Sequence, residues 1–409
     1  MEIIKKKILM VMPALPFPYR GAEQMDRAFG IKQLIRLGYD VRVIAKVSEW
    51  QKSDFVQQTA DELGIQIIPI PYRYSNRSLK IKDKLLKLVS KLSNPMYLDG
   101  AAFEYSESGI QNSLKWEIDN WKPDVVWFEY SYLWPLYHIP SGLNIPIVTR
   151  SINFEPNHFL EEDGKSPINL VKYIPKYIGE SLISKRSDVV FSITPKEQKI
   201  YTKIGAKRVA NLPLRALPNY LEYKHTVVDK QTLNVFFMGS TYTVEHNKKA
   251  LLEVIAKIAP PIYKSNPTEF KFYIIGNKFP TEYNKYLVNN VEYVGYVDDI
   301  DEFMNKMDIA LIPSLFGAGM QQKIFESLVR GFPTITSERG IGDYSFMNEV
   351  DVLFASNSND FCESLLKLKD FDFRQKLSEN AVSKSKELFS NKVYDQTVMD
   401  VLDSFQKPL

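Results

Sequence analysis

Short apolar runs alternate with amphipathic stretches along the first half of the chain. An apolar run at 7–12 is followed by a proline-rich turn, Gly21 and a helical pattern that ends before Gly38, and the next apolar run lies at 41–45. A strand, a loop, a helix and a second strand in this order form one unit of a parallel sheet. Strands covered on both faces are apolar runs bounded by turn residues. Further runs of this kind lie at 65–70, 125–128, 145–149, 189–193 and 209–212.

The same alternation restarts in the second half. Polar residues replace the apolar runs between 218 and 229. Two doubly wound α/β halves joined at this segment are therefore predicted, and ligands of such folds bind outside the carboxyl ends of the strands. The predicted strands are 233–238, 270–275, 291–296, 309–313 and 334–336, and the predicted helices are 247–258, 300–307, a helix that includes 325–330, and 372–405.

The segment 314–333 contains a strand end, a glycine-bearing loop and a short amphipathic helix. A helix N-terminus after such a loop can present backbone N–H groups to phosphate oxygens. Lys323, Glu326 and Arg330 share the polar side of this helix, and the apolar side carries Ile324, Phe325, Leu328 and Val329. Two interpretations stay open: a site for a diphosphate and a sugar hydroxyl, or an ordinary surface helix with a weak Lys323–Glu326 pair.

Composition narrows the class of protein. A length of 409 residues favours two domains, and 44% hydrophobic with 25% charged residues is typical of a soluble globular protein. One cysteine, Cys362, excludes an internal disulfide framework and suits the cytoplasm. A net charge of +3 does not indicate nucleic-acid binding, and four scattered histidines do not indicate a metal site. The apolar run 8–12 is too short for a signal-peptide core, and no run is long enough to span a membrane.

A basic amphipathic stretch occupies 73–92, where leucines and Val89 interleave with lysines and Arg77. Such a helix could lie on the anionic inner face of a membrane and bring the protein to a lipid-linked partner. The alternative is a helix that covers a sheet, with its lysines in water.

Several strand-end motifs of the second half occur in an order that resembles a known family. They are 236–240 (FFMGS) with His246 and Asn247, 272–276 (FYIIG), 291–297 (VEYVGYV), 308–314 (DIALIPS), and the loop 317–319 (GAG) leading to Lys323 and Glu326. In this order they resemble the GT-B glycosyltransferases, and more closely glycosyltransferase family 4, over nearly the whole chain and most strongly over 233–340.

The resemblance implies a GT-B fold of two Rossmann-like domains that face a central cleft. Residues 1–220 would form the acceptor-binding domain and residues 221–385 the donor-binding domain. Residues 386–409 would form a C-terminal helix that packs back on the N-terminal domain.

The resemblance also implies roles for single residues. Glu326 would bind the ribose hydroxyls of a nucleotide sugar, and Lys323 would face the diphosphate. The remaining donor-binding candidates are the phosphate- or sugar-binding loop Gly319, Met320 and Gln321, the close-approach positions Gly239, Ser240 and Gly276, and Tyr296 and Val297 near the base.

Arg20 and Gly21 occupy the first strand-to-helix loop, which matches the family's glycine loop beneath the leaving group. A tight turn that requires Gly21 is the alternative.

The chain departs from the family pattern at two positions. Ala318 stands where many members carry a first glutamate, with seven residues between it and the position of Glu326. Ile152 stands where a histidine is often found. Asn153, Glu155 and His158 remain as catalytic candidates that could orient an acceptor hydroxyl, although His158 also fits an ordinary loop histidine.

These features lead us to expect a glycosyltransferase that moves a sugar from a nucleotide-diphosphate sugar to a glycan or lipid-linked acceptor. Retention of anomeric configuration and a role in bacterial surface polysaccharide or glycolipid synthesis are implied by the resemblance. We expect no metal and no cofactor besides the nucleotide-sugar co-substrate, because the adjacent Asp298 and Asp299 are not an Asp-x-Asp motif and more simply cap a helix. The alternatives are a non-catalytic GT-B protein that binds nucleotide sugar or partners an active transferase, and an epimerase.

Overall fold

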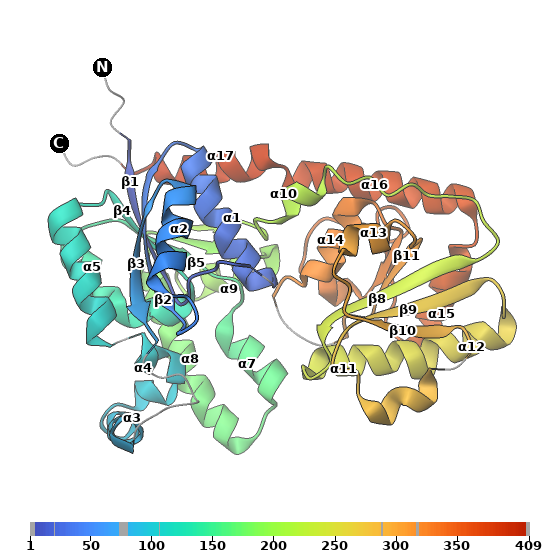
Figure 1. The fold of residues 1–409 in the computed structure, drawn as a ribbon, viewed down its shortest axis with the longest axis horizontal. Coiled ribbons are helices and arrows are strands. Elements are labelled where there is room, and N and C mark those ends of the chain that lie inside the picture. Colours follow the sequence, from blue (N-terminus) through green and yellow to red (C-terminus); the bar gives the residue numbers. More distant parts are fainter. Residues whose placement is uncertain are drawn as a thin grey trace. The chain divides into compact units, whose positions relative to one another are not determined.

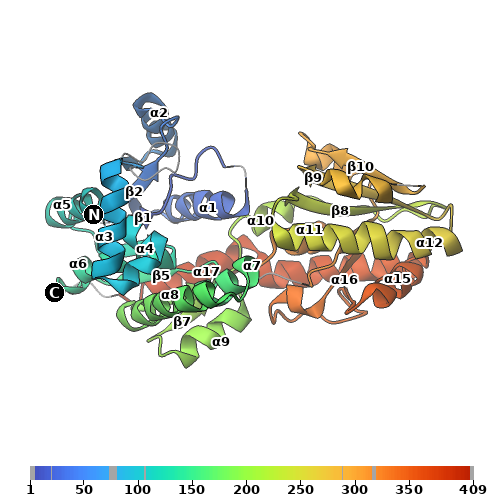
Figure 2. The same ribbon diagram turned by 90° about the horizontal axis from the view of Figure 1, so that it is seen from below.

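The computed structural model describes residues 5–19, 21–72, 81–105, 107–287, 289–315 and 319–405 (Figures 1 and 2). Its contacts divide the chain into two compact units. Unit 1 comprises Met1–Arg215 and Asp395–Leu409, and unit 2 comprises Ala216–Tyr394. The domain boundaries predicted from the sequence lie after residues 220 and 385. In the structure the first segment of unit 1 ends earlier, at Arg215, because Arg215 donates hydrogen bonds to Asp26 and Glu129 of that unit.

Unit 1 alternates strands and helices, as predicted. Its strands are β1 (Lys7–Met12), β2 (Asp40–Val47), β3 (Gln66–Pro71), β4 (Val125–Glu129), β5 (Ile147–Arg150), β6 (Val189–Ser192) and β7 (Val209–Asn211). Its helices are α1 (Ala22–Arg36), α2 (Ser53–Leu63), α3 (Ile81–Ser93), η1 (Pro95–Leu98), α4 (Gly100–Glu104), α5 (Ser108–Trp121), η2 (Ser131–Leu136), α6 (His138–Ser141), α7 (Glu155–Asp163), α8 (Pro167–Arg186), α9 (Pro195–Lys203) and, at the C-terminus, α17 (Asn391–Leu402), most of which belongs to this unit.

Unit 2 repeats the pattern. Its strands are β8 (Leu233–Thr241), β9 (Phe270–Asn277), β10 (Val291–Gly295), β11 (Ile309–Ile312), β12 (Thr334–Thr336) and β13 (Leu353–Phe354). Its helices are α10 (Leu217–Tyr220), α11 (Glu245–Leu252), the π-helical η3 (Glu253–Ile258), α12 (Ala259–Ser265), η4 (Thr281–Tyr286), α13 (Ile300–Met304), α14 (Gln322–Arg330), η5 (Glu338–Ile341), α15 (Ser358–Lys367) and α16 (Phe371–Phe389).

Both sheets are parallel and doubly wound. The strand orders are β3-β2-β1-β4-β5-β6-β7 in unit 1 and β10-β9-β8-β11-β12-β13 in unit 2. Helices α1 and α5 lie on opposite sides of the first sheet, and α14 and α11 on opposite sides of the second (Figure 1). The predicted α/β fold with two Rossmann-like domains is therefore confirmed. Strand β13 was not predicted because two residues are too few to show a pattern.

Each sheet has its own apolar core. In unit 1, Leu9 and Val11 of β1 pack with Leu114 of α5 and Ile183 of α8. A second cluster occupies one face of the unit 2 sheet and includes β8, α11, η3 and α15 residues such as Phe237, Leu251, Val254 and Phe361. These clusters fix the strands whose carboxyl ends carry the candidate residues.

The predicted C-terminal helix 372–405 is two helices, α16 and α17. Ser390 separates them because its backbone is extended, with φ −70° and ψ 153°. From Asp395 onward the chain belongs to unit 1. The Asp395 carboxylate accepts hydrogen bonds from Gln33 and Arg36 of α1, the Gln33 bond being 3.0 Å long.

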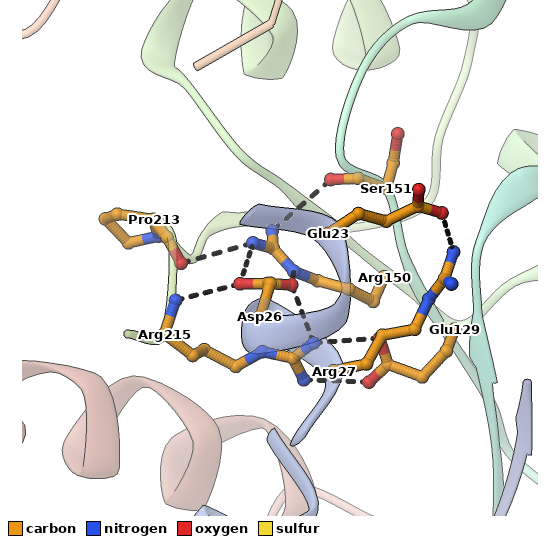
Figure 3. A network of polar contacts seen from close by, with 8 residues as sticks. All are labelled: Glu23, Asp26, Arg27, Glu129, Arg150, Ser151, Pro213 and Arg215. Carbon is orange, nitrogen blue, oxygen red and sulfur yellow. Dashed lines mark hydrogen bonds and ion pairs between the residues drawn. The ribbon is translucent and has the colours of Figure 1, made fainter. Parts of the chain in front are cut away.

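A buried ionic network joins the strand ends of unit 1 (Figure 3). Asp26 of α1 lies 3.3 Å from Nη2 of Arg150, at the end of β5, and 2.7 Å from Nη2 of Arg215. Arg215 also contacts Glu129, at the end of β4, at 2.7 Å. Burial would raise the pKa of Asp26, but the two guanidinium groups outweigh it and hold that pKa well below its usual range. Gly30 leaves room for Arg215, since a Cβ there would lie 2.0 Å from its Nη1.

Candidate donor and acceptor sites

Helix α14 begins at Gln322, directly after the glycine loop. Gly319 adopts φ +73°, which favours glycine, and Gln321 is the extended N-cap residue. The predicted apolar side of the helix is fully buried: Ile324, Phe325, Leu328 and Val329. Residues 316–318 are outside the described residues, so Ala318 cannot be placed. The helix therefore holds Lys323 at its first turn, next to the loop.

Lys323 is a half-buried cation with a neutral partner. Its Nζ donates to Oδ1 of Asn247 at 2.9 Å and lies 5.2 Å from the ring centre of Phe237. The Asn247 amide donates to the carbonyl of Thr241 at 3.1 Å, which orients the asparagine oxygen toward the lysine. Within the described part of the chain, no carboxylate forms an ion pair with Lys323. Burial lowers the pKa of its ammonium to about 8.

Glu326 does not pair with Lys323. It is buried, at 5% exposure, and its Oε1 lies 3.0 Å from Nη2 of Arg330. Its Oε2 accepts from the Gln322 amide at 3.0 Å. Burial raises the pKa of Glu326 although Arg330 acts in the opposite direction. The interpretation as a surface helix with a weak Lys323–Glu326 pair is therefore wrong.

Arg330 is held between two tyrosine rings. Its guanidinium carbon lies 4.6 Å from the ring centre of Tyr220 and 4.7 Å from that of Tyr223. It also contacts the Asp301 carboxylate at 2.7 Å. These contacts fix the arginine, and the arginine in turn fixes one oxygen of Glu326.

Gly239 and Gly276 meet where β8 and β9 end. A Cβ on Gly276, whose φ is +139°, would lie 2.1 Å from the Gly239 carbonyl oxygen. A Cβ on Gly239 would lie 2.8 Å from the ring of Tyr242. The chain's own packing thus requires both glycines. Ser240, which follows Gly239 in β8, is exposed.

The two residues assigned to the nucleobase lie beyond the end of β10. Tyr296 is 68% exposed and Val297 is half-buried. Gly295 before them adopts φ +84°. No hydrogen bond or ring contact joins Tyr296 to Lys323 or Gly319 among the described residues. The predicted cap is present nearby, because the Asp299 carboxylate accepts from the Glu302 amide at 2.9 Å.

In unit 1 the structure brings Asn153 and Glu155 together. The Asn153 amide donates to Oε2 of Glu155 at 3.2 Å and to the Tyr130 hydroxyl at 2.6 Å, and Tyr130 donates to the same carboxylate oxygen at 3.0 Å. Lys176 of α8 lies 3.3 Å from Oε1 of Glu155 and 3.3 Å from Asp99. Both carboxylate oxygens of Glu155 therefore already have partners within the chain, so any effect of Glu155 on a ligand would pass through those partners.

His158 lies one turn along α7 from Glu155. Its side chain is half-buried, and its buried Nδ1 has no hydrogen-bond partner within the described residues. A histidine satisfied by its surroundings is therefore not what the structure shows.

Gly21 is the N-cap residue of α1, and Arg20 is outside the described residues. The φ of Gly21 is −152°, which residues other than glycine also adopt. A Cβ placed on it would meet nothing within 4 Å. The alternative in which a tight turn requires this glycine is therefore wrong.

Several partners of the candidate residues were not assigned from the sequence. Asn247 lies inside a motif that the resemblance used, so its position carried a signal. Tyr130 and Lys176 carried none, because their partners are distant in sequence. Among the described residues, no group of three or more His, Cys, Asp or Glu side chains could hold a metal ion. The described helices include none that is long and apolar enough to cross a membrane.

Comparison with known proteins gives a family match within unit 2. Residues 232–370 match the family model described as glycosyl transferases group 1. This segment contains every donor-binding candidate and Asn247. No curated protein matches the chain in sequence.

Solved structures match over the whole chain. HepE from Anabaena in complex with UDP-glucose is 14% identical, with 97% of this chain and 99% of that chain covered and a TM-score of 0.64. Sucrose-phosphate synthase from Thermosynechococcus elongatus is 12% identical, with 98% and 99% covered and a TM-score of 0.66. A glycosyltransferase from Rickettsia africae is 14% identical, with 99% and 100% covered and a TM-score of 0.63.

These similarities extend over both units, whereas the family match lies in unit 2 alone. The whole chain therefore has the GT-B fold of these structures, and its C-terminal half carries a segment that matches glycosyl transferases group 1.

Proposed function

We propose that unit 2 binds a nucleotide-diphosphate sugar and that Lys323 contacts its diphosphate. The observation that carries this proposal is the state of Lys323: a half-buried ammonium held by the neutral Asn247 and the ring of Phe237. Burial removes water from this ammonium and no carboxylate replaces it. An anionic ligand would therefore stabilise the charged lysine strongly. The N-terminus of α14 adds its own amides and dipole.

The other donor contacts follow from the same helix and the neighbouring strand ends. Glu326, oriented by Arg330, would accept from ribose hydroxyls, and the Gly319–Gln321 amides would face phosphate or sugar. Tyr296, with its exposed ring, would stack on the base. HepE structures contain UDP or UDP-glucose, so UDP-glucose is the first donor to test.

Isothermal titration with a panel of nucleotide-diphosphate sugars tests donor binding, and product analysis of the same mixtures tests the chemistry. We expect saturable binding of one donor and slow hydrolysis to free sugar without acceptor. Conversion of the donor to a different sugar would instead identify an epimerase. Tight binding with neither hydrolysis nor transfer to any glycan or lipid extract would identify a non-catalytic binder.

We further propose that Asn153, Glu155 and His158 orient the acceptor hydroxyl. His158 lies one turn from Glu155 on α7 and would act beside it, whereas Glu155 would act through Asn153 and Tyr130. Transfer would retain the anomeric configuration, as the family resemblance implies. The anomer released first during donor hydrolysis, followed by proton NMR, tests retention.

A lipid-linked acceptor in bacterial surface polysaccharide or glycolipid assembly is supported by helix α3, which covers the described part of the basic stretch 73–92. Its apolar side chains face outward: Leu85, Leu88, Val89 and Leu92 are 61%, 56%, 55% and 78% exposed. They follow a helical spacing, so they form one stripe, and the lysines of this segment would favour an anionic lipid surface. We propose that this stripe binds the membrane surface.

Cosedimentation with vesicles tests this surface. Wild-type protein should bind vesicles that contain phosphatidylglycerol more strongly than vesicles of phosphatidylcholine alone. Leu88→Glu with Leu92→Glu should abolish the difference. Trp116→Glu, at an equally exposed position on α5, is the matched control and should bind as wild type does. Equal sedimentation of all three proteins would exclude this surface as the membrane contact.

A further inference from the structure

Three buried hydrogen bonds hold consecutive residues of the β5–α7 loop. Ser151 Oγ donates to the Asn153 carbonyl at 2.9 Å. The Phe154 amide donates to Oε1 of Glu197 at 3.0 Å, and the Glu155 amide donates to Oε1 of Glu180 at 3.2 Å. Glu180 lies on α8 and Glu197 on α9, so two neighbouring helices fix the loop that carries the acceptor-site candidates.

A second set of contacts connects the same groups through a tyrosine. Tyr201 Oη lies 2.7 Å from Ser151 Oγ and 2.8 Å from Oε2 of Glu180. Ser151 and Tyr201 are 0% exposed, and Glu180 is 2% exposed. The result is a continuous chain from Glu180 through Tyr201 and Ser151 to the Asn153 carbonyl.

The number of hydrogens bears on the protonation state of this chain. With Glu180 ionised, Tyr201 donates to its carboxylate and Ser151 donates to the Asn153 carbonyl, which leaves the 2.7 Å Tyr201–Ser151 contact without a hydrogen. The chain's three hydrogen bonds need three hydrogens, while the hydroxyls of Tyr201 and Ser151 supply one each. The Asn153 carbonyl only accepts, so the third hydrogen must come from the carboxyl group. Only one order then satisfies every contact: Glu180 donates to Tyr201, Tyr201 donates to Ser151, and Ser151 donates to the carbonyl.

The surroundings of Glu180 favour this neutral form. Burial raises the pKa of Glu180 to about 8. The negative charge of Glu155 on α7 also raises it, while the hydroxyls of Ser131 and Tyr201 lower it. Glu197 of α9 is a further nearby acid, and Tyr137 faces Glu180 from the end of η2.

Lys176, one turn before Glu180 on α8, is engaged elsewhere. Lys176 contacts Glu155 and Asp99, each at 3.3 Å.

We propose that Glu180 is a protonated positioning residue, whose carboxyl hydrogen completes the chain that holds Asn153 and Glu155 in place. The proposal rests on the acceptor role proposed for those two residues. Loss of the proton removes one bond of the chain and places a second negative charge beside Glu155. The loop would then loosen as pH rises.

A stability measurement tests the protonation without reference to activity. Glu180→Gln keeps a donor for Tyr201 and an acceptor for the Glu155 amide but has no proton to lose. In wild type, the native chain holds a proton that the unfolded chain releases above the ordinary value of 4.5. Native stability therefore falls as pH rises from there toward the folded pKa.

Urea unfolding of the full chain between pH 5 and 8 should show this linkage. The unfolding constant of wild type, divided by that of Glu180→Gln, should rise about tenfold per pH unit. Other titrating groups, Glu197 included, occur in both proteins and cancel. A ratio independent of pH would show that Glu180 is ionised in the native state and would overturn the proposal.

Turnover tests the positioning role. With the donor kept saturating at each pH, so that the titration of Lys323 does not contribute, wild type should lose activity on the alkaline side. Under the same conditions Glu180→Gln should lack that decline, and Glu180→Ala should be impaired at every pH. Tyr201→Phe interrupts the chain. In the Tyr201→Phe background, Glu180→Gln should therefore no longer change the pH profile of activity. An unchanged alkaline decline in Glu180→Gln would overturn positioning by this proton. If no donor is turned over at all, the failure belongs to the proposed function, and the unfolding ratio still decides the protonation.

Discussion

Lys323 Nζ donates to Asn247 Oδ1 at 2.9 Å, and this bond joins helices α14 and α11 from opposite sides of the unit 2 sheet. The partner is neutral, which leaves the positive charge for a ligand. Asn247→Asp would place a carboxylate against the ammonium and near the proposed diphosphate. The new carboxylate would form an ion pair with the Lys323 ammonium and would repel phosphate, so donor affinity should fall by at least about tenfold.

Asn247→Ala is the control for this substitution, since it removes the orienting bond without adding charge. Calorimetry should rank the affinities as wild type, Asn247→Ala and then Asn247→Asp. Equal donor affinity of the two variants would contradict a diphosphate at this position.

Donor binding should weaken on the alkaline side because the pKa of Lys323 is lowered to about 8. Below that value the lysine is charged before the ligand arrives. Above it the lysine must take up a proton on binding, so the dissociation constant should rise, approaching about tenfold per pH unit. Titrations between pH 7 and 9 measure this change. Lys323→Arg stays charged throughout and should show a flat profile; a parallel rise in this variant would assign the pH dependence to another group.

Much of the fold could be predicted because its signals are local. The strands are contiguous apolar runs, and the polar segment near 218–229 marks a change of unit. The apolar side of α14 follows from a spacing of three and four residues. The two-domain architecture and helix α14 needed no information about distant contacts.

The chemistry around those elements depends on distant contacts and could not be predicted. Glu326 pairs with Arg330 and not with Lys323, and Lys176 forms ion pairs with Asp99 and Glu155 from other elements. The requirement for Gly276 likewise arises from a neighbouring strand. A single sequence shows which residue stands at each such position but not which distant residue it contacts.

Gly276→Ala tests that close packing. The added Cβ would meet the Gly239 carbonyl at 2.1 Å, and the φ of +139° disfavours any side chain. The backbone strain alone should lower the free energy of unfolding by about 1–3 kcal/mol. Urea unfolding measures the loss. Gly100→Ala, where a Cβ meets nothing within 4 Å and no positive φ is required, should unfold nearly as wild type does. Similar losses in both variants would contradict the packing argument.

Lys176→Met should destabilise unit 1 strongly. Lys176 lies between Asp99 and Glu155, whose side chains are 5% and 7% exposed. Without the ammonium, two buried carboxylates repel each other, and a loss of about 3–5 kcal/mol is expected. Lys172→Met, one turn earlier on α8, should change the stability by no more than about 0.5 kcal/mol. Thermal and urea unfolding of the two variants make the comparison, and equal stability would show that the two carboxylates do not depend on Lys176.

The central claim, that Lys323 binds the diphosphate of a sugar donor, is tested most directly by calorimetric titration of Lys323→Met. Lys306→Met is the matched control, because Lys306 is an exposed lysine of the same unit paired with Glu302. A charge-assisted bond to phosphate contributes about 1.5–3 kcal/mol, so Lys323→Met should weaken binding of the nucleotide-diphosphate sugar about 10- to 100-fold. Lys306→Met should bind as wild type does. Unchanged affinity in a folded Lys323→Met protein would contradict the account.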